Sequence, residues 1–171
     1  MNKMQQLIRK NHMDISWHEY TDEDGANVPV TQASLTEKAS IIGRVGIMLL
    51  SCGTGAWRVR SSMNTLAEIM GITCTADIGL MSIEYTCFDG QDGFSQSLCL
   101  TNTGVNTSKL NRLEHFIQEF EVDGKDMSGE ELHVLLDNIE KNSWTVLTDC
   151  TWFCGCSGLR RIYFPAWWRP H

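Results

Sequence analysis

Cys52 is the residue best placed to do covalent chemistry. It stands at the expected end of a helix, directly before a Gly-Thr-Gly run. Backbone amides at such a break can lower the pKa of a thiol, and His115 or His133 would then be the candidate base of a thiol-dependent hydrolase. The alternative is a half-buried small residue at a helix end. We favour it because free cysteine is among the most buried residue types, and we expect no enzyme and no catalytic residue.

Two further patterns partly match ligand-binding motifs, one for zinc and one for phosphate, and both lack an essential part. Cys150, Cys154 and Cys156 could be combined with His171 as a zinc site, but they lack the common C-x2-C spacing. The run from Gly53 to Gly55 precedes a helix but follows another helix instead of a strand, and it has no Lys to reach a phosphate. We therefore predict neither a metal nor a cofactor, and a tight interhelical turn at the glycines. Solvent-facing positions are expected for the histidines that show no i, i+4 ligand spacing, namely His12, His18, His115 and His133.

The elements that position these residues follow from periodicity. A capping box at Ser34 opens a helix that ends near Ser51 and carries a single apolar stripe, formed by Ala39, Ile42, Gly46, Leu49 and Leu50. A second helix runs from about Ala56 to a closing Gly71. Alternating residues then predict strands over 72–78, 81–87 and 94–101, and further helices follow Asn106 and Ser128. The prediction is a two-layer α+β domain with about four helices on a small three-stranded antiparallel meander.

The composition limits the class of protein. The 171-residue chain is 42% hydrophobic and carries a net charge of -7, so we expect a folded domain and no nucleic-acid partner. Its seven cysteines are odd in number, and four of them lie in apolar patterns, which is typical of reduced thiols. We find no apolar run of signal-peptide or membrane-spanning length, and we expect the chain alone to be cytoplasmic.

Three segments differ in composition. Residues 1–33 mix basic and acidic residues without a long apolar period and are interpreted as a flexible lead-in, in which Leu7, Ile8, Ile15 and Trp17 could make one frayed turn that docks on the core. Residues 34–143 are the expected folded domain. Residues 144–171 are rich in Trp, Cys and Arg and follow neither period. One hypothesis is that the reading frame is lost near Leu147, which would truncate the protein, and the other is an exposed amphipathic tail whose tryptophans lie at a membrane surface.

The order of these elements resembles the soluble N-terminal domain of the threonine/serine exporter family, in particular the small subunit of its split, two-protein form. The resemblance is carried by spaced glycines and apolar residues in four segments: Gly46 to Gly55, Val59 to Gly71, Ser97 to Thr101, and Gly104 to Leu110. It implies that Gly53, Gly55, Gly104 and Asn106 are candidate binding positions. Asn102 and Thr103 stand where family members commonly carry arginines, and helix capping explains Asn106 equally well.

The resemblance also implies a function and partners. The full-length family member would lie at the cytoplasmic face of the inner membrane and export small hydroxy amino acids or, in the split form, dicarboxylates. This chain would be a cytoplasmic domain that works with the membrane subunit of a split exporter and is inactive alone, and homo-oligomers are also expected. The alternatives are a free-standing dimerisation or regulatory module and the thiol hydrolase that uses Cys52.

Overall fold

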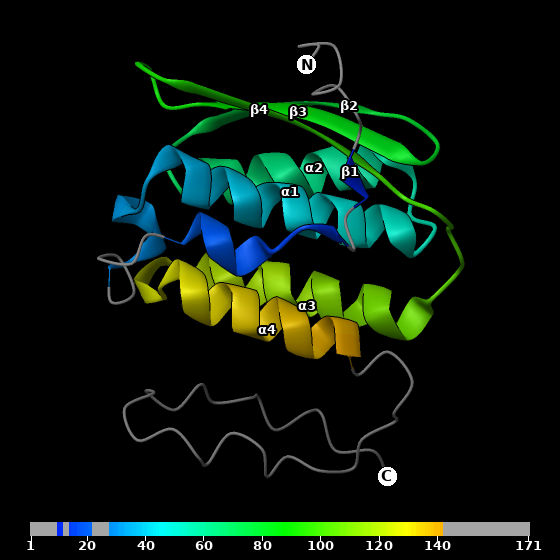
Figure 1. Ribbon diagram of the computed structural model, residues 1–171. Coiled ribbons are helices and arrows are strands. Elements are labelled where there is room, and N and C mark those ends of the chain that lie inside the picture. The colour runs from blue at the N-terminus through cyan, green and yellow to red at the C-terminus, as the bar shows by residue number, and fades with distance from the viewer. Residues whose placement is uncertain (1–9, 12–13, 22–27, 142–171) are drawn as a thin grey trace, which may run out of the picture.

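The computed structural model describes residues 10–11, 14–21 and 28–141 (Figure 1). It confirms the α+β prediction of four helices and a three-stranded antiparallel sheet. The elements follow one another as β1 (Lys10–Asn11), η3 (Trp17–Tyr20), η5 (Val30–Gln32), α1 (Leu35–Ser51), α2 (Ala56–Ile69), β2 (Thr73–Ile78), β3 (Ser82–Phe88), β4 (Gly93–Cys99), α3 (Thr107–Val122), η6 (Gly124–Asp126) and α4 (Gly129–Lys141).

The sheet has the strand order β1-β4-β3-β2. The predicted meander is present, with β3 antiparallel to both β2 and β4. The two-residue β1, which the sequence did not predict, pairs parallel to β4 at the other edge. Thr75, Thr86 and Ser95 are exposed on the outer face of the sheet, while Ile83, Cys87 and Leu98 are buried on the inner face. The alternation of a half-buried antiparallel sheet therefore holds along β3 and weakens in the second half of β4.

Helix α1 is the centre of the molecule. Together with α2 it covers the inner face of the sheet, and α3 and α4 lie on the far side of this helical layer (Figure 1). Every residue from 39 to 50 is buried, whereas the sequence suggested a single apolar stripe. A helix enclosed on all sides must bury its polar residues as well, and Ser40 and Arg44 are buried with the rest.

Local capping signals set the helix boundaries as the sequence predicts. The Ser34 hydroxyl accepts a hydrogen bond from the Glu37 amide at 3.3 Å. At α4 the capping box is reciprocal, because the Glu131 amide donates to Ser128 Oγ at 3.3 Å and the Ser128 amide donates to Glu131 Oε2 at 3.0 Å. Each contact satisfies an amide that the first helical turn leaves unpaired.

Part of the N-terminal segment packs into the core. Ile15, Trp17 and Val30 are buried in the same cluster as the helices, and the Val30 amide donates to the Met127 carbonyl at 2.8 Å. The domain boundaries at 33 and 143 stay predictions. Of the turn expected from Leu7, Ile8, Ile15 and Trp17, the last two residues are buried, whereas Leu7 and Ile8 lie outside the described residues. The segment 144–171, with Cys150, Cys154, Cys156 and His171, also lies outside them. Within the described ranges, no helix combines the length and apolar character needed to cross a bilayer.

Candidate functional site

The two glycine motifs that the sequence nominated separately meet at one end of the molecule. The loop that leaves β4 passes the C-terminal end of α1 before it enters α3 (Figure 1). There the Gly104 amide donates to the Ser51 carbonyl at 3.3 Å, and the Asn106 amide donates to the Cys52 carbonyl at 3.5 Å. The last carbonyls of a helix have no partner within it, so this loop acts as the cap of α1. We call residues 51–57 and 102–106 the turn site.

Glycine occupies positions 53 and 55 of the turn site for different structural reasons. Gly53 has φ +77°, the left-handed region that other residues adopt only at a cost, and a Cβ there would lie 3.5 Å from the Val105 side chain. Gly55 has φ -64° and is the N-cap of α2, with no side-chain cap. Asn106 caps α3, because its Oδ1 accepts from the Lys109 amide at 2.9 Å. The structure thus assigns Asn106 a capping role, as the sequence allowed.

A buried lysine lies beneath the turn site. Lys109 is 8% exposed, and its ammonium lies 3.5 Å from Ser51 Oγ and 3.8 Å from Glu140 Oε1. Its charge lies beside the C-terminal residue of α1, where the helix dipole favours a cation. The neighbouring Cys52 is buried, and burial raises the pKa of its thiol despite the opposing charge of Lys109. Cys52 is therefore a protonated thiol at neutral pH.

The turn site exposes two large apolar side chains. Trp57 is 70% exposed and Val105 is 86% exposed, and both flank the turn from Gly53 to Gly55. Arg58 lies over the Trp57 ring at 5.4 Å and pairs with Glu114 at 3.1 Å, which restrains the indole. Thr54 is buried, and its hydroxyl finds no hydrogen-bond partner in the described part of the chain.

A second polar cluster, which the sequence did not predict, joins α1 to α4. Arg44 is 2% exposed and forms ion pairs with Asp137 and Glu140, the latter at 3.4 Å. Its guanidinium donates to His133 Nδ1 at 3.3 Å, and His133 Nε2 lies 3.1 Å from Ser40 Oγ. Burial lowers the pKa of His133 to about 3, and Arg44 adds to this effect. The prediction that His133 faces solvent is therefore wrong.

His18 extends this cluster to the N-terminal segment. Its Nδ1 lies 3.0 Å from Glu130, and its Nε2 lies 3.3 Å from Asp137. The hydrogen bond to Glu130 is the main reason that the pKa of His18 is raised above its ordinary value of 6.5. The pairing of His18 with Glu130 and Asp137 attaches η3 to α4. We therefore interpret the cluster as a structural contact between these elements and not as a ligand site.

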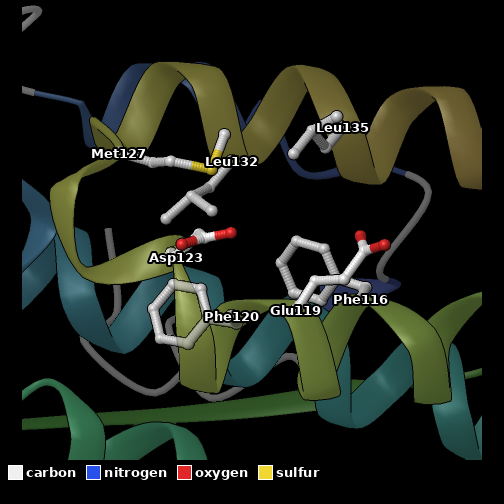
Figure 2. A pocket seen from close by; sticks show the side chains of 8 residues that line it. Phe116, Glu119, Phe120, Asp123, Met127, Leu132 and Leu135 are labelled. Atoms are coloured by element: carbon white, nitrogen blue, oxygen red, sulfur yellow. The ribbon is translucent and has the colours of Figure 1, made fainter. Parts of the chain in front are cut away.

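The crevice between α3 and α4 is too small for a metabolite. It is lined by the rings of Phe116 and Phe120, by Leu132, and by the carboxylates of Glu119 and Asp123 (Figure 2). Its cavity volume of about 20 Å³ has room for about one water molecule. Burial raises the pKa of Glu119, since its carboxylate lies against these apolar walls. Over the described ranges, no group of three or more His, Cys, Asp or Glu residues could hold a metal ion.

Comparison with known proteins gives one match. A family model described as "Putative threonine/serine exporter" matches residues 40–168. The match includes all four candidate binding positions of the turn site. It also continues through most of the segment in which the composition changes. No curated protein and no solved structure matches the chain.

Proposed function

We propose that this chain, which belongs to the threonine/serine exporter family, forms an accessory domain on the cytoplasmic face of the inner membrane and assembles with the membrane subunit of a split exporter. The membrane subunit transports the solute, and this domain holds the membrane subunit in its working arrangement. The exported solute is a small hydroxy amino acid or a dicarboxylate. In this account the chain has no transport activity of its own.

The turn site is the observation that carries the proposal. Exposed tryptophan is enriched at the centres of protein interfaces, and single exposed apolar residues are otherwise unremarkable. Here Trp57 and Val105 project from elements locked together by the Gly104 and Asn106 amides, so both are presented on a rigid base. A rigid aromatic anchor loses little conformational entropy on binding. These features support docking of a partner at this end.

The chemistry of the nearby residues supports a role other than catalysis. A thiol hydrolase needs Cys52 as a thiolate beside a base. Burial raises the pKa of Cys52, and His133 is held by Ser40 and Arg44. The charge of Lys109 acts in the other direction but does not overcome burial.

Co-purification tests the assembly. The full chain would be co-expressed with the membrane subunit of a split exporter of this family and purified through a tag on that subunit. We expect the wild-type chain to co-purify and the double variant Trp57→Ser, Val105→Ser to be lost. The matched control is Val122→Ser, because Val122 is 75% exposed but lies at the C-terminal end of α3, away from the turn site.

Light scattering on the purified chain distinguishes the proposed assembly from the alternative, a free-standing dimerisation module. A dimer that dissociates in the double variant, together with no co-purification of the wild type, would favour a free-standing dimerisation module. Equal retention of the wild type and the double variant on the membrane subunit would mean that the turn site is not the interface.

A further inference from the structure

Two cysteines face each other across β2 and β3. Cys74 and Cys87 are partners in the antiparallel register, and their side chains lie on the inner face of the sheet. Cys52 lies at the end of α1 instead, and Cys99 is opposite Ser82. Among the described cysteines, only Cys74 and Cys87 occupy directly opposed strand positions.

The turn between β2 and β3 shows whether Cys74 and Cys87 form a hydrogen-bonded or a non-hydrogen-bonded pair of the antiparallel ladder. The Gly79 amide donates to the Ser82 carbonyl at 2.8 Å, which makes these opposed residues a hydrogen-bonded pair. Hydrogen-bonded and non-hydrogen-bonded pairs alternate along an antiparallel ladder. Counting back from Gly79, the pairs at Ile78, Ala76 and Cys74 are non-hydrogen-bonded. Cα atoms in such pairs are about 4.5 Å apart, which lies within the range of about 4.4 to 6.8 Å that a disulfide spans.

The two thiols differ in access and in acidity. Cys74 is 8% exposed, whereas Cys87 is fully buried. A hydrogen bond from Cys87 lowers the pKa of Cys74, and the same contact together with burial raises the pKa of Cys87. The more accessible thiol is thus also the one that ionises first, as the attacking residue of a thiol–disulfide exchange requires.

We propose that Cys74 and Cys87 are a redox-active pair that closes to a cross-strand disulfide, with Cys74 as the attacking thiol and a low-molecular-weight disulfide as the oxidant. The Cys74 thiolate attacks one sulfur of the oxidant R–S–S–R, and the first thiolate leaves and takes up a proton. The Cys87 thiol then loses its proton and attacks the Cys74 sulfur, which expels the second thiolate. The two cysteines are oxidised, one R–S–S–R is reduced, and the two thiol protons end on two R–SH molecules.

The disulfide would attach β2, an edge strand of the sheet. In the strand order, β2 pairs with β3 alone and is also packed against α2. A disulfide to β3 would lower the conformational entropy of the unfolded chain and raise the midpoint of thermal unfolding by roughly 5 °C or more. The inference is independent of the proposed transport role, because it concerns the sheet and not the turn site.

Mass spectrometry of the folded full chain tests the pair. The chain would be equilibrated with mixtures of oxidised and reduced glutathione, alkylated and digested without reduction by trypsin and a glutamyl endopeptidase. Cleavage after Glu68, Glu84 and Lys109 separates Cys74 from a peptide with Cys87 and Cys99. We expect a linked peptide that weighs two hydrogen atoms less than its parts, in the wild type and in Cys99→Ser.

The variants of Cys87 and Cys99 should differ from each other. In Cys87→Ser we expect no linked peptide, and Cys74 should instead retain one glutathione, because its resolving thiol is gone. Absence of the link from the folded wild type at every glutathione ratio would overturn the proposal. So would a link to Cys74 that survives in Cys87→Ser and disappears in Cys99→Ser. The wild-type result requires no substitution, so the test stands even where a variant folds poorly.

Discussion

At the scale of single residues, Arg44 is the charge on which the helical layers most depend. It is 3% exposed at its side chain, and its partners Asp137 and Glu140 are 29% and 28% exposed. We expect Arg44→Met to lower the free energy of unfolding by about 3 kcal/mol, because removing one member of a buried ion pair leaves its partners uncompensated. Urea denaturation followed by circular dichroism measures this change.

Arg58 provides the matched control. Its pair with Glu114 has the same chemistry, but the two side chains are 44% and 40% exposed. Arg58→Met should therefore cost less than about 1 kcal/mol, as exposed ion pairs do. Equal losses in the two variants would contradict the view that burial makes Arg44 important.

His18 gives the molecule a pH dependence with a defined sign. Its folded pKa is raised above 6.5 by Glu130 and Asp137, so the folded state binds the proton more tightly than the unfolded chain. The stabilisation is fully present below 6.5 and is lost as the pH rises through the folded pKa. We expect the difference in unfolding free energy between wild type and His18→Gln to be larger at about pH 6 than at about pH 8.5.

The effect of His133 on the pH dependence of stability is opposite to that of His18, so the two effects must be distinguished. Its folded pKa is lowered to about 3, so it destabilises the fold as the pH falls below 6.5. Both proteins in the comparison contain His133, which is neutral in the folded state at about pH 6 and at about pH 8.5 because its pKa is about 3, so its effect cancels. A difference that grows as the pH rises would contradict the assigned role of His18.

At the scale of elements, Gly53 is the point at which α1 must stop. We expect Gly53→Ala to lower the free energy of unfolding by about 1 to 2 kcal/mol, because a side chain disfavours the left-handed backbone. Gly55→Ala is the control, since Gly55 has an ordinary φ of -64° and its Cβ would meet the Trp57 ring at 3.4 Å. Thermal unfolding that ranks Gly55→Ala as the worse variant would overturn this explanation.

Elements set by short-range signals could be predicted from the sequence. The cap at Ser34, the capping box at Ser128 and the cap at Asn106 depend on residues three positions apart, and each of these side-chain caps is present. The β1 strand could not be predicted in this way, because two residues carry no period and their position is set by pairing with β4.

At the scale of the whole molecule, the contacts that define the sites join distant parts of the chain. Both halves of the turn site were nominated from the sequence, but their meeting depends on how α1 and α3 pack. The Arg44 cluster was missed because its partners lie 89 to 96 residues away. Ile15 and Trp17 were expected in a turn that docks on the core, but a single aromatic residue in a charged segment shows no amphipathic pattern that would identify its contacts.

The proposed assembly can be tested by efflux of labelled threonine from cells that express the membrane subunit of a split exporter, this chain, or both. We expect rapid efflux only when both are present, and its loss when the chain carries Trp57→Ser and Val105→Ser. Efflux at the full rate from the membrane subunit alone, or an unchanged rate with the double variant, would contradict the assembly role assigned to the turn site.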